Sequence, residues 1–289
     1  MIKGLAPKTE KVFIALSELD FIKDYILVGG TALSLQIQNR LSEDLDFMRW
    51  RVTKSEHLEI PWNKIEAHLK KMNLGKVTTD VLDFNQVLFV VADVKLSFYF
   101  RDSYAPEDIK AIPFMGSIRV ADLHSIGVMK IDAMLRRGVF RDYYDLYSIL
   151  KQGIDIDQLI GKAAKYSGYA TKTKNITAII SNGSRFIFDD SFKQLKPIYN
   201  ISKDEIESFI KKNLEKNKEV VFTEQEIPTG ELAKLGLSFN DLSKEDQIKL
   251  LKGEKTGSIN LKGYRRHKSV QISLERSTNK VDILVYPIS

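Results

Sequence analysis

The sequence predicts an α+β fold in which a sheet-and-helix core is followed by a helical region. Strand-like segments dominate the first hundred residues, and amphipathic helical patterns take over from Ile118. Runs of strands followed by runs of helices are typical of this fold class. We therefore expect a core over residues 1–117, a helical domain over residues 118–218 and a small C-terminal α+β module over residues 219–289.

The core is predicted to alternate between helices and strands. Helices are expected over residues 8–23, 31–39 and 54–72, the last with a break at Pro61, and strands over residues 25–28, 44–49, 77–82, 86–91 and 94–100. The helices rest on apolar residues at helical spacing, and the strands on runs of β-branched and aromatic residues. Ala92-Asp93 is expected to form the two-residue turn of a hairpin between the last two strands.

The remaining chain is predicted to be mainly helical. A long amphipathic stretch over residues 121–137 ends at Gly138, a residue suited to the end of a helix. Further helices are expected over residues 141–151, 156–166, 176–188 and 203–218. The pattern changes near Asn217, and two strands are expected over residues 270–274 and 281–286, joined by Ser277-Thr278-Asn279.

The most informative motif is a glycine turn followed by two aspartates. Gly29 and Gly30 follow a short apolar strand and permit a turn without Cβ clashes. The next helix is expected to begin at Thr31, which would cap it, and its unpaired amides attract anions. Asp44 and Asp46 lie two residues apart on the next strand, so their side chains share a face.

Phosphate-binding amides beside a carboxylate pair suit a complex of Mg²⁺ and a nucleotide. Proteins hold Mg²⁺ through one or two carboxylates together with substrate phosphates. Asp44 and Asp46 are therefore the predicted metal ligands. Gly29, Gly30 and Thr31 are predicted to contact phosphate. Arg40 and Ser42, which precede the aspartates, either shape the loop or touch phosphate.

A second block of charged residues lies on two consecutive predicted helices. Lys130 shares a face with Ile126 and Met134, so it either extends along apolar surface to solvent or points at a charge. Arg137 lies seven residues further on, on the same face.

The acidic members of this block are Asp142 and Asp145. Asp142 lies at the start of its helix, where it either interacts with the helix dipole and pairs with Arg141, or belongs to the site. Asp145 lies deeper, beside Leu146, and either orients Lys130 or accepts a proton from an attacking hydroxyl.

Together the two blocks resemble a known family. The order G-G-[ST] then D-x-D resembles the first motif of the DNA polymerase β-like nucleotidyltransferases. The longer strings G-G-T-A-L and R-x-S-x-D-x-D-F look like those of the AbiEii/AbiGii-type nucleotidyltransferase toxins. The second block is similar to that family's K-x-x-A-x-x-x-R and [RK]-D-x-x-D-L signature, and the resemblance covers roughly residues 5 to 200.

The resemblance implies a polymerase β-like core with a helical second domain. It implies that Lys130 binds the triphosphate, with Arg137 nearby, and that Asp142 and Asp145 join the aspartate pair as catalytic candidates. Such enzymes commonly carry a third carboxylate on a later strand, where this sequence offers Ser97. Either Asp93 substitutes for it, or the site uses Asp145 beside the aspartate pair.

Composition restricts the class of protein. The chain has 289 residues and a net charge of +6. It contains no cysteine, which excludes disulfides and thiolate zinc sites. The four histidines lack metal-binding spacing. No apolar run reaches the roughly 18 residues of a membrane span, and no export signal is evident, so a cytoplasmic protein is expected. The cluster Tyr264-Arg265-Arg266-His267-Lys268 either contacts RNA or is a solvated strand edge.

The resemblance implies a Mg²⁺-dependent nucleotidyltransferase that is a toxin of a toxin–antitoxin or phage-defence system. Relatives of this kind attach nucleotides to tRNA 3′ ends, so NTP, RNA (above all tRNA) and a cognate antitoxin are the implied partners. Two alternatives remain at this point. The acceptor is instead a protein or a small molecule, or the protein is a catalytically silent nucleotide-binding regulator.

Overall fold

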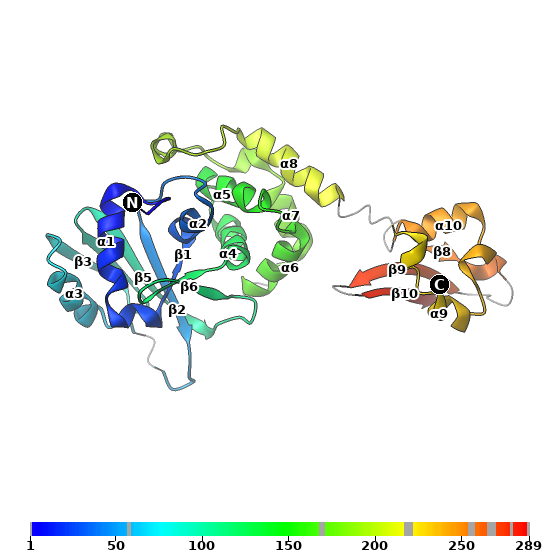
Figure 1. Ribbon diagram of the computed structural model, residues 1–289, viewed down its shortest axis with the longest axis horizontal. Helices are drawn as coiled ribbons and strands as arrows, with labels where there is room; N and C mark the ends of the chain where they lie inside the picture. The colour runs from blue at the N-terminus through cyan, green and yellow to red at the C-terminus, as the bar shows by residue number, and fades with distance from the viewer. Residues whose placement is uncertain are drawn as a thin grey trace. The chain divides into compact units, whose positions relative to one another are not determined.

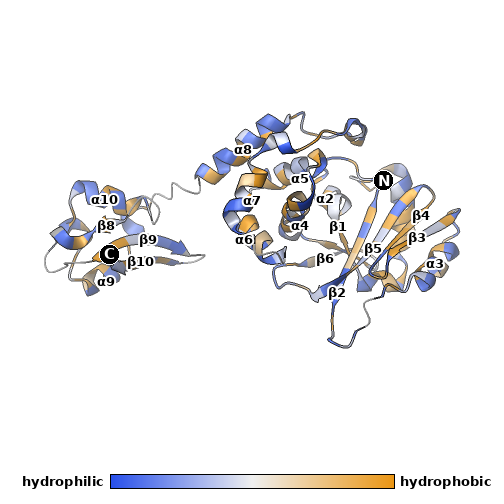
Figure 2. Ribbon diagram, turned by 180° about the vertical axis from the view of Figure 1, so that it is seen from behind, coloured by the Kyte–Doolittle hydropathy of each residue, from blue (hydrophilic) through white to orange (hydrophobic). Residues whose placement is uncertain are grey.

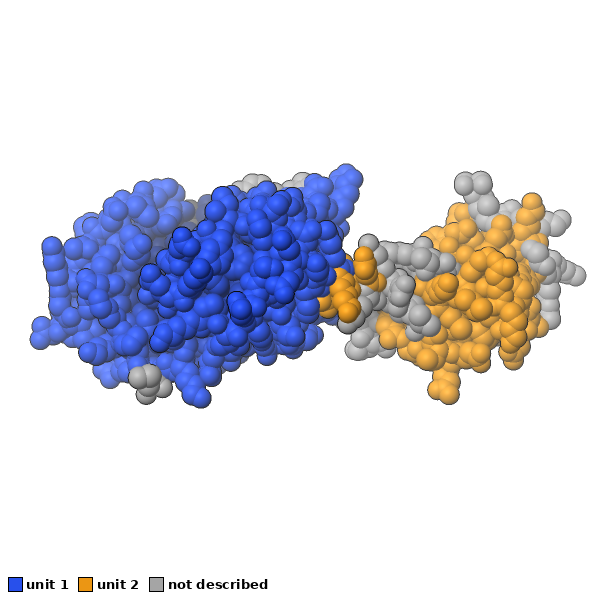
Figure 3. Space-filling view, turned by 90° about the horizontal axis from the view of Figure 1, so that it is seen from above, with its two compact units in different colours: residues 1–211 blue, residues 212–289 orange. Residues whose placement is uncertain are grey.

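The computed structural model describes residues 2–287, apart from 57–58, 168–170, 217–221, 254–257, 265–269 and 278–279. The chain divides into two compact units, Met1–Lys211 and Lys212–Ser289, which Figure 3 colours separately. Both units combine helices with strands, so the predicted α+β class is confirmed. The further division of the first 218 residues into a core and a helical domain stays a prediction.

A seven-stranded mixed sheet lies at the centre of the first unit (Figure 1). Its strands are β1 (Ile26–Val28), β2 (Leu45–Arg51), β3 (Val77–Asp83), β4 (Gln86–Val91), β5 (Val94–Tyr104), β6 (Ala111–Met115) and β7 (Ile118–Ala121). The order across the sheet is β3-β4-β5-β2-β1-β7-β6. β2 pairs parallel with β5, and β1 pairs parallel with β7. The short strand β1 therefore lies next to β2, where the glycine turn meets the aspartate pair.

Eight α-helices surround this sheet in the part of the first unit and its boundary that the structure describes. They are α1 (Pro7–Ser17), α2 (Gly29–Ile37), α3 (Trp62–Lys71), α4 (Leu123–Arg136), α5 (Phe140–Leu150), α6 (Ile156–Tyr166), α7 (Thr173–Ile180) and α8 (Lys203–Lys216). Short 3₁₀ turns are η1 (Asp20–Asp24), η2 (Gly183–Arg185) and η3 (Asp190–Leu195). α4 is the central helix, because it packs against α2, α5, α6 and α7.

One face of the sheet is an aromatic core. Phe47 of β2 stacks on Phe98 of β5 with 5.2 Å between ring centroids, and both rings are fully buried. Tyr25 and Phe89 pack edge-on against Phe98 at 5.0 and 5.7 Å. Hydrophobic residues along β4 and β5 are visible in Figure 2. Since strand side chains alternate, the residues between these aromatics face the other side of the sheet.

The prediction that the chain becomes helical at Ile118 is wrong for its first four residues. Residues 118–121 form β7, which pairs with both β1 and β6. Four residues are too few to show a strand period, so neighbouring strands decide the conformation. The helix begins at Leu123, after Asp122, whose carboxylate accepts a hydrogen bond from the Ser125 amide as an N-cap.

Other boundaries shift for local reasons. The predicted helix over residues 8–23 is α1 followed by η1, and the helix expected over residues 54–72 forms only from Trp62. Proline has no amide hydrogen to donate to a preceding turn, so Pro61 precedes the helix. The helix expected over residues 176–188 ends at Ile180. The predicted hairpin turn is confirmed, with positive φ of 51° at Ala92 and 62° at Asp93.

The second unit has its own hydrophobic core. It contains α9 (Thr229–Lys234), α10 (Lys244–Leu251), β8 (Ile259–Asn260), β9 (Val270–Ser277) and β10 (Lys280–Pro287), with turns η4 (Glu224–Glu226), η5 (Phe239–Asp241) and η6 (Leu261–Gly263). Leu232, Leu250 and Leu274 are fully buried in this core. The two predicted strands are confirmed, while residues 278–279 and the basic residues 265–268 lie outside the described residues. In the described chain, no helix is both long and apolar enough to cross a membrane.

Candidate active site

The aspartate pair lies where β2 and β5 run side by side, on the face opposite the aromatic core. Asp46 is in register with Ser97, and Met48 is in register with Tyr99. Asp44 immediately precedes β2 and lines the same cavity as Asp46. The two predicted metal ligands are therefore brought together in one cavity, which Ser97 and Tyr99 also line.

Burial raises the pKa of Asp46. The Ser97 hydroxyl lowers this pKa and the charge of Asp44 raises it, while Lys130 has a smaller lowering effect. Burial disfavours the charged form of a carboxylate, and the hydrogen bond from Ser97 and the charges of Lys130 and Arg137 offset this effect only in part.

The glycine turn fits closely around this carboxylate. Gly29 has a φ of +71°, a conformation that favours glycine, and a Cβ there would lie 3.0 Å from Oδ2 of Asp46. α2 begins at Gly29 itself, and its N-cap residue Val28 offers no side-chain cap. The first amides of α2 therefore remain available to an anion next to the aspartates.

The prediction that Thr31 caps this helix is wrong, because α2 begins two residues earlier. The Thr31 hydroxyl instead bonds the Ser42 hydroxyl at 2.7 Å and donates to the carbonyl of Asp44. These bonds fasten the loop before β2 onto α2. They hold Asp44 at a fixed distance from the glycine turn.

Arg40 and Asp145 form a buried, bidentate ion pair. Nε and Nη2 of Arg40 each lie 2.8 Å from a different oxygen of Asp145, and Asn39 Nδ2 donates to the same carboxylate at 3.0 Å. Such a fork fixes both distance and orientation. A Cβ at Gly30 would lie only 2.3 Å from Nη2 of Arg40, so the second glycine makes room for the guanidinium under the turn.

Lys130 continues this network into the helices. Its Nζ lies 2.8 Å from Asp142 and 2.6 Å from Asp145, and the lysine is buried. Arg137 binds Asp142 at 2.7 Å from Nε, and 60% of its side chain is exposed. Asp142 thus pairs with Lys130 and Arg137, while the predicted alternative partner Arg141 is 3.8 Å from Asp189.

These ion pairs determine the titration of both acidic residues. Burial alone would raise the pKa of Asp145, but Arg40 and Lys130 hold it well below its usual range. Burial likewise acts to raise the pKa of Asp142, and Lys130 and Arg137 outweigh that effect and lower it. A carboxylate that stays ionised in this way is a weak proton acceptor. The geometry of Asp145 suits the alternative in which it orients Lys130.

A cavity of about 390 Å³, here called the polar cavity, gathers the predicted site residues. The predicted residues that line it are Gly29, Gly30, Thr31, Arg40, Ser42, Asp44, Asp46, Lys130, Arg137 and Asp142. Asp145 lies beneath them, fully buried. Segments that are about a hundred residues apart in the sequence therefore form one lining.

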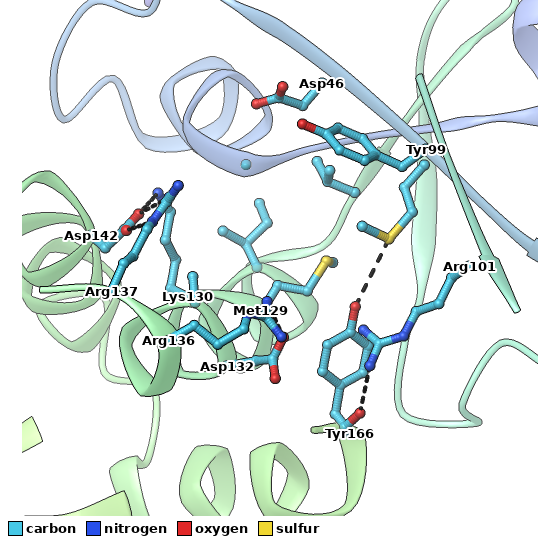
Figure 4. A pocket seen from close by; sticks show the side chains of 15 residues that line it. Asp46, Tyr99, Arg101, Met129, Lys130, Asp132, Arg136, Arg137, Asp142 and Tyr166 are labelled. Carbon is cyan, nitrogen blue, oxygen red and sulfur yellow. Dashed lines mark hydrogen bonds and ion pairs between the residues drawn. The ribbon is translucent and has the colours of Figure 1, made fainter. Parts of the chain in front are cut away.

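A second cavity of about 320 Å³, here called the apolar cavity, adjoins the first (Figure 4). The two share Gly29, Asp46, Tyr99, Lys130, Arg137 and Asp142. Its further lining includes Met48, Arg101, Met129, Asp132, Arg136 and Tyr166, none of which was singled out from the sequence. The alternation of β2 and β5 could have identified Met48, Tyr99 and Arg101, since they share the face of Asp46.

The two candidates for the third carboxylate position lie in different places. Ser97 lines the polar cavity directly beside Asp46. Asp93 lies in the hairpin turn with 83% of its side chain exposed, where it pairs with Lys8 at 3.1 Å. Of the two, Ser97 therefore occupies the neighbourhood of the aspartate pair.

The donor set can be tested against Mg²⁺. Among the described residues, no group of three or more His, Cys, Asp or Glu side chains is placed to hold a metal ion by itself. Mg²⁺ needs only one or two carboxylates when phosphates and water complete its shell. Asp44 and Asp46 fit this requirement, because both line the cavity at the start of α2.

The chain is similar to several known proteins. An uncharacterized protein of Aquifex aeolicus is 26% identical over 201 residues, which cover 68% of this chain and 89% of that protein. JHP933 from Helicobacter pylori has 19% identity and a TM-score of 0.43, covering 79% of this chain and 97% of its own. MenT4, a nucleotidyltransferase toxin of Mycobacterium tuberculosis, has 13% identity and a TM-score of 0.41, covering 72% and 84%. The family model described as nucleotidyl transferase AbiEii toxin, type IV toxin–antitoxin system, matches residues 12–225.

Proposed function

Because this chain belongs to the AbiEii nucleotidyl transferase toxin family, we propose that it transfers a nucleotide from Mg-NTP to RNA, with the tRNA 3′ end as the favoured acceptor. The family assignment makes the protein a nucleotidyltransferase toxin with a cognate antitoxin. The metal, the acceptor and the roles of individual residues are our proposals.

The observation that carries the proposal is the juxtaposition of the start of α2 with the aspartate pair. The start of α2 and the two aspartates line the polar cavity. They lie so close together that a Cβ at Gly29 would be 3.0 Å from Oδ2 of Asp46. Phosphates at the α2 amides would therefore lie beside Asp44 and Asp46. These are the two kinds of group that a metal-bound triphosphate requires.

The aspartate pair would hold Mg²⁺, which when bound neutralises charge on the phosphates. The α2 amides bind the triphosphate, helped by Arg137, whose exposed side chain lines both cavities. Lys130 uses two of its three N–H groups for Asp142 and Asp145, and we assign the third to a phosphate oxygen. The oxygen of an acceptor hydroxyl then attacks the α-phosphorus while its proton passes to water, and pyrophosphate leaves with the electrons of the broken P–O bond.

The remaining cations support a nucleic-acid acceptor. Lys95 is exposed and Arg141 is half-exposed, and both line the polar cavity beside the aspartates. Neither belongs to the buried network of Arg40, Lys130, Asp142 and Asp145, so their charge can meet the phosphates of an RNA end. Binding of this kind should weaken as salt concentration rises.

The proposal is tested by incubating the protein with each α-³²P-labelled NTP, Mg²⁺ and total RNA. Label in the tRNA band is expected, and it should be absent for Asp46→Asn at an unchanged melting temperature. Label on protein or on a small molecule would replace the acceptor we propose. Intact NTP binding with no label on any acceptor would instead support a silent nucleotide-binding regulator.

A further inference from the structure

The apolar cavity holds a polar feature that the proposed reaction does not use. Asp132 lies on the cavity side of α4 and is only 2% exposed. Its Oδ2 accepts from Nη2 of Arg136 at 2.7 Å. Its Oδ1 is shielded from solvent and has no hydrogen-bond partner in the described part of the chain. A buried acceptor without a donor is unfavourable, so an unpaired oxygen beside a cavity points to a ligand donor.

The rest of the lining suits a flat heteroaromatic ring. Met48, Ile126, Met129 and Ala133 contribute apolar surface. At the far end Tyr166 stacks with the Arg101 guanidinium, whose carbon lies 4.2 Å from the ring centroid.

Tyr166 and Arg101 are held in place. Nη2 of Arg101 donates a hydrogen bond to the Tyr166 carbonyl at 3.1 Å. The Tyr166 hydroxyl donates to the sulfur of Met48 at 3.9 Å. Figure 4 shows these two residues and Asp132 at the end of the cavity away from Asp46. At this end, the cavity therefore combines the planar surface of the Tyr166–Arg101 stack with the polar groups of Asp132 and Arg136.

The position of this cavity relates it to the nucleotide. It shares Asp46, Tyr99 and Arg137 with the polar cavity. An NTP whose phosphates bind at the start of α2 and whose α-phosphate lies at Asp46 would extend its nucleoside past Tyr99 into the apolar cavity. The cavity volume of about 320 Å³ accommodates a nucleoside.

We propose that the apolar cavity binds the base of the donor NTP and that Asp132 and Arg136 select cytosine or adenine, whose pairing edge carries an exocyclic amino group beside an unprotonated ring nitrogen. The inference rests on the proposed function. Cytosine and adenine each present an amino donor beside a ring-nitrogen acceptor. Asp132 Oδ1 accepts from the amino group, while the remaining N–H groups of Arg136 donate to the ring nitrogen.

Uracil and guanine present a carbonyl oxygen where these bases carry the amino group. In the same pose that oxygen would face Asp132 Oδ1, and the ring N–H next to it would face the N–H groups of Arg136, so neither contact would be a hydrogen bond. Because Oδ1 is shielded, the half-exposed Arg136 side chain must shift when the base enters. The selection is therefore made when Arg136 closes on the correct base.

The test is calorimetric titration of the full chain, in Mg²⁺, with α,β-methylene analogues of the four NTPs. We expect the analogue of ATP or CTP to bind at least about tenfold more tightly than those of GTP and UTP, the effect of one unpaired buried polar group. In Asp132→Asn, the side-chain amide can donate a hydrogen bond to a base carbonyl. The substitution should therefore reduce this preference to within about threefold or invert it. Asp157→Asn, the same change on an exposed residue of α6, should leave the preference unchanged.

Each outcome is decisive. Equal binding of the four analogues, a preference for guanine or uracil, or an unchanged preference in Asp132→Asn overturns the inference. A change only in the KM for RNA would assign the cavity to the acceptor and overturn it as well. Failure of the wild-type protein to bind any analogue would instead refute the proposed function. If Asp132→Asn does not fold, Arg136→Gln tests the same edge and should also reduce the preference.

Discussion

Replacing Asp145 with asparagine should destabilise the first unit strongly. The carboxylate binds Arg40 through two bonds of 2.8 Å and Lys130 at 2.6 Å, and it is fully buried. Asparagine keeps the shape but leaves two buried cations with one anionic partner fewer. Breaking a buried ion pair from one side costs about 3–5 kcal/mol. For a unit of this size, we expect the melting temperature to fall by about 6–20 °C.

The assay is thermal and urea unfolding of the full chain, followed by circular dichroism. The control is Asp93→Asn, which makes the same chemical change in the exposed pair with Lys8 and should leave unfolding unchanged. An Asp145→Asn protein that unfolds within about 1 kcal/mol of wild type would refute the reasoning, because the pair would then be nearly neutral.

The same experiment has a pH dependence with a defined sign. The pKa of Asp145 lies below its unfolded value, so its contribution to stability is fully present above the unfolded pKa, about 3.9. That contribution is lost as pH falls through the folded pKa. The difference in unfolding free energy between wild type and Asp145→Asn should therefore be constant near neutral pH and shrink at acid pH. A difference that grew towards acid pH would contradict the assignment.

Three further perturbations test neighbouring parts of the molecule. Asp46→Asn should abolish nucleotidyl transfer while circular dichroism and melting temperature stay close to wild type, and undiminished transfer would exclude it as a ligand. Gly30→Ala places a Cβ 2.3 Å from Arg40 Nη2, so the free energy of unfolding should fall by about 1–3 kcal/mol. The affinity for NTP, measured by calorimetric titration, should fall as well. A fragment of residues 1–218 should fold and keep NTP binding, because both cavities are lined by residues up to Tyr166; a folded fragment without NTP affinity would mean that the second unit completes the site.

Much of the site's local geometry follows from sequence spacing alone. A spacing of two positions puts Asp44 and Asp46 on one side of a strand, and two glycines after a short strand permit a tight turn. Such features depend on backbone periods, which a sequence displays directly. The hairpin at Ala92-Asp93 was predictable for the same reason.

Partners across long sequence separations were not predictable. Arg40 and Asp145 are 105 residues apart, and nothing near either residue specifies the other. From the sequence, Arg40 could either shape the loop or contact phosphate. In the structure its guanidinium binds the buried carboxylate of Asp145. Ile118–Ala121 likewise became a strand only because β1 and β6 offered edges to pair with. Tertiary pairing overrides a weak local pattern in such short segments.

The buried network has a consequence for how substrates enter and leave. Arg40 belongs to the loop before β2, whereas Lys130 and Asp145 belong to α4 and α5, so the network spans the sheet side and the helix side of the site. A hinge that opened the site between these sides would draw charges apart in a medium of low dielectric constant. Turnover should therefore proceed in a frame that stays closed, with access controlled by exposed side chains such as Arg137 rather than by separation of the two halves.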